Sequence, residues 1–237
     1  MQEHSIDLMK HAHLTRQLDI IPVQSLGMPV TIIGCGAIGS FLGLSLAKMG
    51  LANITLYDHD TVSIENMSNQ FFPFSAIDTN KATALQQLIQ DFTRIKVTAH
   101  PFKFEADPVS VMQLRGVVVV AVDSMEARRN IFEAIKMYGF GVTHIIDPRM
   151  GAEEFHMYTI QPRVVEDQAT YEKTLYSDSE AVQERCTAKS TVYTSTLASG
   201  MVVKAIKNIL LKEAYPRVTL WNIKASSNAM VMYAGGL

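Results

Sequence analysis

The fold can be predicted outward from Val30–Asp60, VTIIGCGAIGSFLGLSLAKMGLANITLYDHD. A short apolar run leads into Gly34, Gly36 and Gly39, and a second apolar run closes on Asp58. This order predicts a buried strand, a glycine turn, a helix and a second strand. In such a unit the first glycine permits a tight turn, the second lets the backbone approach a phosphate, and the third lets the helix pack on the strand.

The same stretch predicts a nucleotide that carries ribose and phosphates. A carboxylate at the end of the second strand can accept hydrogen bonds from a pair of ribose hydroxyls. We expect the nucleotide to be held by Gly34, Gly36, Ala37, Gly39 and Asp58. The glycine spacing alone does not distinguish NAD from ATP.

Apolar runs and helical periodicities continue the alternation along the chain. Strands are predicted over residues 29–34, 53–57, 95–99, 116–122, 142–147, 153–160 and 217–225, and helices over 37–49, 80–92, 123–139 and 190–211. Continuous apolar strands between helices predict an α/β fold, a doubly wound, Rossmann-like and mainly parallel sheet. The polar, acid-rich residues 162–188 predict a long, mobile crossover loop in the C-terminal third of a single domain, 1–237.

Composition narrows the classes of partner and compartment. With 48% hydrophobic residues and a net charge of −2, the chain can bury a core and has no electrostatic reason to bind nucleic acid or an anionic membrane. Ile20–Ala47 carries no charge but is interrupted by prolines and glycines, which disfavours a membrane helix. Cys35 and Cys186 provide no disulfide scaffold and no structural zinc site, so a reducing cytoplasm is expected.

The segment after the glycine loop is more specific. The run LYDHDTVSIENMSNQFFPFSAIDTNKATAL contains Asp60, Asn66, Gln70 and Lys81 in that order. It resembles the ThiF/MoeB/ubiquitin-activating family of adenylating enzymes, which have an Asp-x-Asp-x-Val, an Asn before an Arg-Gln pair, and a lysine that opens the next helix. The segments LTRQLDI and VVAVDSMEARRNI are similar to two further family segments.

The resemblance implies that ATP, with Mg²⁺, is bound rather than NAD. It implies that Lys81 reaches the phosphates, that Asn66 donates to phosphate, and that Asp123 is the ligand of Mg²⁺. Asp60 and Gln70 join the nucleotide-binding residues, although Asp60 is equally compatible with a loop cap. The alternatives without a role in the site are a solvent-exposed Lys81 and an Asp123 that caps a helix.

The family reaction also implies partners. A C-terminal carboxylate attacks the α-phosphate of ATP and yields an acyl-adenylate and pyrophosphate. The expected substrate is a small ubiquitin-like or sulfur-carrier protein, or a peptide, with a Gly-Gly-type end. Arg16 is expected to reach the ATP of a partner subunit, which implies a homodimer.

Two residues leave questions open. Asn69 stands where the family has the arginine of its Arg-Gln pair, so another cation must substitute or activity is weakened. The candidates are Arg16, Arg94, Arg128 and Arg149, although Arg128 is better suited to brace a loop. Cys186 is either a thiol that accepts the acyl group, with Lys189 lowering its pKa, or an inert loop residue.

Two rival functions remain. One is an NAD-linked oxidoreductase, although the sequence offers it no obvious acid–base pair. The other is a non-catalytic relative that binds nucleotide or pairs with an active subunit, which the Asn69 departure permits.

Overall fold

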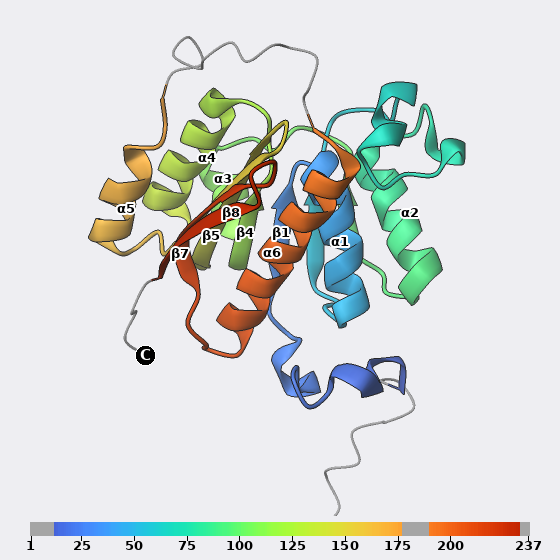
Figure 1. The fold of residues 1–237 in the computed structure, drawn as a ribbon, viewed down its shortest axis with the longest axis horizontal. Helices are drawn as coiled ribbons and strands as arrows, with labels where there is room; N and C mark the ends of the chain where they lie inside the picture. Colours follow the sequence, from blue (N-terminus) through green and yellow to red (C-terminus); the bar gives the residue numbers. More distant parts are fainter. Residues whose placement is uncertain (1–11, 177–189, 233–237) are drawn as a thin grey trace, which may run out of the picture.

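A central eight-stranded sheet organises the chain in a computed structural model that describes residues 12–176 and 190–232. The strand order is β3-β2-β1-β4-β5-β6-β7-β8 (Figure 1). The bounds are β1 Val30–Ile33, β2 Ile54–Tyr57, β3 Thr98–His100, β4 Gly116–Val120, β5 Val142–Gly151, β6 Glu154–Ile160, β7 Pro216–Asn222 and β8 Ser227–Met232. The pairs from β3 to β5 are parallel and those from β5 to β8 are antiparallel.

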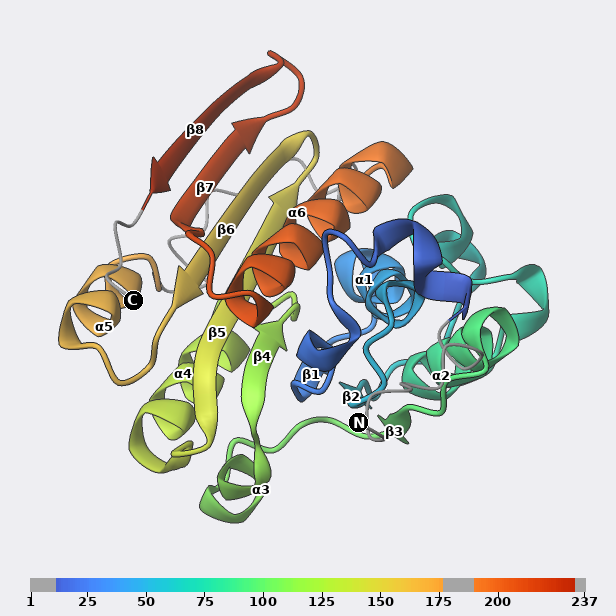
Figure 2. The ribbon, with the colours of Figure 1, turned by 90° about the horizontal axis from the view of Figure 1, so that it is seen from below.

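Helices cover both faces of this sheet (Figure 2). The α-helices are α1 Ala37–Met49, α2 Lys81–Thr93, α3 Pro108–Gln113, α4 Met125–Tyr138, α5 Val165–Glu172 and α6 Val192–Leu210. Short 3-10 turns are η1 Ala12–Gln17, η2 Val23–Ser25, η3 Ile64–Ser68 and η4 Phe74–Ala76. One apolar core joins α1, α2 and α6 to the sheet, and a second joins α3, α4 and α5 to its other face. The predicted doubly wound α/β fold with a mainly parallel sheet is therefore confirmed.

The sequence of the central strands explains their position. Every residue of β1 (VTII) and of β4 (GVVVV) is buried. Strands that are covered on both faces favour continuous β-branched residues, since both sides of the pleat then pack against helices. The same property makes these two strands the rigid frame for the loops after them.

Two differences from the sequence prediction concern the third strand and the polar segment after β6. The third strand is short and begins at Thr98, because Arg94 adopts a left-handed conformation (φ 65°) and the chain turns there first. The predicted loop over 162–188 is wrong in its first part, where α5 forms with Tyr171 only 1% exposed. The last turn of α5 packs against the sheet through Tyr171. This tertiary contact, rather than sequence periodicity, stabilises so short a helix. Residues 177–189 lie outside the described residues.

Contacts distant in sequence join the two ends of the described chain to α1. Ser199 Oγ in α6 donates to Ile38 O at 2.8 Å, at the first turn of α1. At the other end of α1, Gln17 Nε2 donates to Met49 O at 2.6 Å. Helix α1 is thereby held by α6 along its side and by η1 at its C-terminal end. Among the described residues, no helix combines the length and apolar character that crossing a membrane requires.

Candidate nucleotide and metal site

The carboxyl ends of β1, β2 and β4 form one edge of the sheet, because these strands are parallel neighbours. From β1 the chain proceeds outward to β2 and β3, then crosses back to β4 on the other side. Ligands of open α/β sheets bind at such a reversal of strand order, just beyond the carboxyl ends of the strands. The loops after these three strands carry the predicted site residues.

The glycine loop has the predicted geometry. Gly34 has φ 99°, and a Cβ there would lie 2.5 Å from Ala121 O on the neighbouring strand's continuation. A Cβ on Gly39 would lie 2.0 Å from Gly34 O, so only glycine lets α1 start this close to β1. Gly36 differs, since the nearest atom to its Cβ position is Gln70 Nε2 at 4.0 Å. Open space above this glycine is the room that a phosphate needs.

The N-terminus of α1 faces the same space. Its N-cap is Gly36, which supplies no side-chain cap, and Ala37 begins the helix. The first backbone N–H groups of a helix lack internal partners and carry the positive end of the helix dipole. They are therefore available to an anion, as at helix N-termini that bind phosphate.

Asp58 fastens the end of β2 to the glycine loop. Its Oδ2 accepts from Cys35 N at 2.6 Å, its Oδ1 accepts from Asp60 N at 2.8 Å, and it is 8% exposed. A carboxylate can accept about four hydrogen bonds, so capacity for ribose hydroxyls is left. Burial and the charge of Asp58 raise the pKa of the Cys35 thiol well above its usual value, which makes Cys35 a structural residue.

Lys81 is buried beside Asp58 and paired with Asp60. Its Nζ lies 2.8 Å from Asp60 Oδ2, and only 8% of the residue is exposed. The hydrogen bond from Lys81 lowers the pKa of the Asp60 carboxyl. Asn80, the N-cap of α2, donates to Asp58 O at 2.9 Å and thereby places Lys81 next to the strand end. The solvated alternative for Lys81 is thus excluded.

Three amide side chains come from η3 and the turn after it, and one of them, Gln70, places Nε2 beside Gly36. Asn66 Oδ1 accepts from Ser63 N at 3.0 Å in a capping box, and its amide nitrogen has no partner among the described residues. The amide oxygens of Asn69 and Gln70 are buried without a hydrogen-bond partner. A buried amide oxygen without a partner is costly, so these atoms indicate polar groups that a ligand or water supplies.

The Asn69 departure has a structural counterpart. Asn69 Nδ2 donates to Ser190 Oγ at 2.5 Å, and Ser190 also forms a bridge with Ala152. A side chain that would contact phosphate in the family instead holds the point where the crossover rejoins the described chain. No pattern in the sequence signals this contact, because the two residues lie so far apart along the chain.

Asp123 comes after β4 and is exposed at the sheet edge. Ser124, not Asp123, caps α4, since its side chain accepts from Ala127 N at 3.1 Å. The helix-cap alternative for Asp123 is therefore wrong, and its carboxylate is available to a cation. A second group of possible ligand atoms, from Asp58, His59 and Asp60, lies after β2, two strands away from β4, and these atoms are within 4.8 Å of one another.

Arg128 and Arg149 are both committed to the buried Asp147. Arg128 Nη1 pairs with Asp147 Oδ1 and donates to Val120 O at 3.0 Å, and its Nη2 donates to Val122 O. Arg149 Nε donates to Asp147 Oδ2 at 2.8 Å. The prediction that Arg128 braces a loop is confirmed, because Val122 O lies in the turn before Asp123 and Val120 O ends β4 just ahead of that turn.

The other two candidate arginines lie away from the edge. Arg94 caps the C-terminal end of α2, whereas Lys81 begins that helix. Arg16 is exposed on η1, which is tied to the C-terminal end of α1. A helix of 13 residues is about 20 Å long. Among the described residues, then, none of the four candidates offers a free guanidinium to its own chain's edge. Cys186 and Lys189 lie outside the described residues.

The residues present fit ATP and a divalent cation. Open space over Gly36, free helix N–H groups and a buried lysine suit a polyphosphate, and the orphaned amide oxygens can accept from ribose hydroxyls or water. Exposed carboxylate oxygens at Asp123 suit Mg²⁺, which prefers one or two carboxylates together with phosphate oxygens.

This arrangement defines a doubly wound α/β protein whose candidate ligand site lies where the strand order reverses. Residues 25–234 match the ThiF family, and the chain belongs to that family. The resemblance inferred from the motifs is thereby confirmed.

Curated relatives share part of the chain. The NEDD8-activating enzyme E1 catalytic subunit of Drosophila melanogaster is 35% identical over 102 residues, covering 42% of this chain and 23% of the relative. The corresponding subunit of Dictyostelium discoideum is 31% identical over the same coverage. Ubiquitin-like modifier-activating enzyme 5 of Arabidopsis thaliana is 34% identical over 62 residues, covering 26% of this chain and 14% of that protein. The chain thus spans less than a quarter of these relatives.

Solved structures share the fold at low identity. SeMet PaaA superposes with a TM-score of 0.73 at 15% identity, over 98% of this chain and 85% of that one. Escherichia coli MccB with ATP superposes with a TM-score of 0.67 at 16% identity, over 88% of this chain and 65% of that one. MccB with AMPCPP and its SeMet MccA superposes with a TM-score of 0.69.

Proposed function

We propose that this protein is an ATP-dependent adenylyltransferase that activates a C-terminal carboxylate. The observation that carries the proposal is the convergence of the glycine loop, Asp58, Lys81 and Asp123 at one sheet edge of a ThiF-family chain. Similar proteins support it, since MccB has been solved with ATP and with MccA, and relatives activate NEDD8 and ubiquitin-like modifiers. The substrate is a small ubiquitin-like or sulfur-carrier protein, or a peptide, with a Gly-Gly-type end.

The chemistry needs positive charge at the phosphates. A carboxylate oxygen attacks the α-phosphorus, the bond to the β-phosphate oxygen breaks, and pyrophosphate leaves with the electron pair. Negative charge on the phosphate oxygens is offset by Lys81, by the amide of Asn66 and by the α1 N-terminus. Mg²⁺ supplies further charge neutralisation, and Asp123 would hold it. Asp58 orients the ribose, with Asp60 and Gln70 completing the nucleotide site of a single 1–237 domain.

Arg16 supports a homodimer. Its position at the far end of α1 puts it out of reach of its own glycine loop. A two-fold axis perpendicular to α1 would exchange the two ends of this helix between subunits, so the partner's Arg16 would approach the loop. That arginine is the cation that Asn69 does not provide.

Subunit mixing tests this arrangement. Arg16→Ala and Lys81→Ala proteins, each nearly inactive, should recover part of the activity when their subunits exchange, because one site of each mixed dimer keeps both residues. Absence of recovery after exchange demonstrated by light scattering on tagged subunits would contradict a role of Arg16 across the interface.

Cys186 is proposed as the acceptor of the activated acyl group, in a protein that we place in the reducing cytoplasm. It precedes Ser190, whose Oγ accepts from Asn69 Nδ2. Adenylation itself uses ATP, Mg²⁺ and the carboxylate, and a thiolate enters only if the acyl group passes through the enzyme.

The decisive assay is carrier-dependent ATP–pyrophosphate exchange. Asp123→Ala should lose exchange, whereas Cys186→Ala should keep it and lose only a reductant-sensitive conjugate on a non-reducing gel. Full exchange in folded Asp123→Ala would refute the metal assignment. Loss of exchange in folded Cys186→Ala would refute the division of labour, and no exchange with any carrier or peptide would refute the activity.

A further inference from the structure

The buried carboxylate of Asp147 lies between the candidate metal site and helix α5. Its Oδ1 pairs with Arg128, which also donates to one carbonyl at the end of β4 and to one in the turn before Asp123. Its Oδ2 accepts from the hydroxyl of Tyr171 in α5 at 2.7 Å. One fully buried group is therefore linked to the turn and to the helix through separate oxygen atoms.

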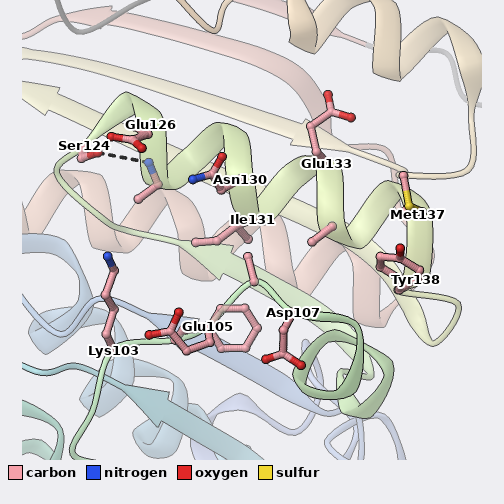
Figure 3. Close-up of a pocket in the computed structure, with 14 residues that line it drawn as sticks. Lys103, Glu105, Asp107, Ser124, Glu126, Asn130, Ile131, Glu133, Met137 and Tyr138 are labelled. Carbon is pink, nitrogen blue, oxygen red and sulfur yellow. Dashed lines mark hydrogen bonds between the residues drawn. The ribbon is translucent and has the colours of Figure 1, made fainter.

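Helix α4 begins directly after this turn. Ser124 follows Asp123 and accepts from Ala127 N at 3.1 Å, the bond that is dashed in the close-up of α4 (Figure 3). The backbone N–H of Arg128 donates to Ser124 O at 3.2 Å. Arg128 therefore ties the turn to α4 through its backbone and to Asp147 through its guanidinium, and the position of Asp123 depends on both contacts.

The same carboxylate also holds the chain that follows α5. Arg149 Nε donates to Asp147 Oδ2 at 2.8 Å. The two Nη atoms of Arg149 donate to Thr174 O and Thr174 Oγ1, at 2.8 Å and 3.0 Å. Arg129, on α4, donates to Leu175 O. The first residues after α5 are thus bound beside one buried group of side chains, the Asp147 cluster, which consists of Asp147, Arg128, Arg149 and Tyr171.

The two ends of α5 have different supports. The helix has 8 residues, a length that does not persist in isolation. Its first turn is fixed by the buried pair of Asp167 and Arg217, which lies outside the Asp147 cluster. Its last turn depends on Tyr171, whose ring packs on Phe132 with centroids 4.8 Å apart and whose hydroxyl bonds to Asp147. The last turn is therefore ordered when the Asp147 cluster is intact and frays when the cluster loosens.

We infer that Asp147 is a positioning residue that couples cation binding at Asp123 to order in the last turn of α5. The turn that carries Asp123 loses freedom when a cation and phosphate are bound to it, and Arg128 is then held more firmly against Asp147. The contacts from Asp147 to α5 form at a smaller cost in entropy once their partner is already fixed. Such coupling is reciprocal, so loosening α5 lowers the affinity for the cation.

The consequence for the reaction rests on the proposed function. Helix α5 precedes Cys186 in the chain, and Cys186 is the proposed acceptor of the acyl group. The chain that leads to this thiol thus gains order at its start when nucleotide and cation occupy the site. Asp147 contacts neither ligand in this account and acts through Arg128 and Tyr171.

Amide hydrogen exchange followed by NMR tests the coupling. The reporters are Thr174 and Leu175, whose N–H groups donate to carbonyls in the last turn of α5 at 2.9 Å and 3.1 Å. In the wild type, MgCl₂ with ATP should slow their hydrogen exchange about fivefold relative to ATP with EDTA, a typical size for coupling between two sites. The N–H of Gln168, which donates to the first turn, should not respond and is the internal control.

Tyr171→Phe separates positioning from mere stability. It removes the link between α5 and Asp147, so the effect of MgCl₂ on the two reporters should disappear. The Mg²⁺ concentration that half-saturates ATP binding in calorimetry should rise about fivefold, at unchanged affinity for ATP in EDTA. Asn208→Ala is the matched control, since it removes a hydrogen bond from a buried side chain to Ala214 O at the far end of α6. It should lower stability and leave both Mg²⁺ responses as in the wild type.

The outcomes separate the coupling from the proposed function. Unchanged hydrogen exchange of Thr174 and Leu175 on addition of MgCl₂ and ATP overturns the coupling, and so does an equal response in Tyr171→Phe and the wild type. ATP–pyrophosphate exchange is measured independently. Slower hydrogen exchange in the last turn, without pyrophosphate exchange for any carrier or peptide, refutes the adenylyltransferase and leaves the coupling in place. Pyrophosphate exchange without this protection refutes the coupling alone.

Discussion

Replacing Asp147 with asparagine should be among the most damaging single substitutions outside the glycine loop. The carboxylate is fully buried and accepts from Arg128, Arg149 and the hydroxyl of Tyr171, the last at 2.7 Å. The side chains of the two arginines are 7% and 11% exposed. Asp147→Asn keeps the shape but leaves two poorly hydrated guanidinium groups without their counter-charge.

The magnitude can be worked from burial. Removing one partner of a buried ion pair costs about 3–5 kcal/mol. Tyr171→Phe is the matched control, since it removes one hydrogen bond to the same carboxylate and should cost about 1.5–3 kcal/mol. The charge argument requires that Asp147→Asn lose more free energy of unfolding than Tyr171→Phe.

Urea unfolding, followed by circular dichroism and the fluorescence of Trp221, measures both variants. With an m-value of about 3 kcal/mol/M, Asp147→Asn should lower the midpoint by about 1 M or more, at unchanged m. A smaller loss in Asp147→Asn than in Tyr171→Phe would show that the arginines find other partners or water, and would refute the reasoning.

Three further predictions concern the site and the core. Gly36→Ala should fold normally yet weaken ATP binding about tenfold or more by calorimetry, because its Cβ fills open space, whereas Gly39→Ala should fail to fold, since its Cβ would lie 2.0 Å from a carbonyl oxygen. Burial lowers the pKa of His144 from 6.5 to about 4, so the unfolded chain binds the proton first and stability falls as pH drops from 6.5 towards 4. The His144 share of that loss, up to about 3 kcal/mol, should be missing in the urea unfolding of His144→Gln. In a Cys186→Ala background, Cys35 should react with a thiol reagent only after unfolding, because its thiol is buried and its pKa is raised.

The order of elements and the glycine loop could be predicted because their causes are local. Continuous β-branched runs, helical spacing and glycines in a tight turn act over a few residues. Asp58 was also identified, yet its hydrogen bond from Cys35 N in the glycine loop exists only in three dimensions.

Contacts between distant segments could not be read from the sequence. Helix α5 depends on the burial of Tyr171 against the sheet, and the burial of Lys81 depends on Asp60 and Asn80 around it. The commitment of Arg149 to Asp147 likewise needs the β5 backbone to be in place. Residue type indicates which groups can pair, but which of the many possible pairs forms depends on the three-dimensional arrangement.

The tie between Asn69 and Ser190, and that between Ile38 and Ser199, set the time at which the site is finished during synthesis. Strands β1 to β4 and their helices leave the ribosome well before α6. Until α6 docks, the side of α1 is bare and the turn at Asn69 has no anchor. A nascent chain that lacks its last third therefore has the glycine loop without the support that fixes it, and competence for nucleotide arrives as a late, long-range step rather than with the motif itself.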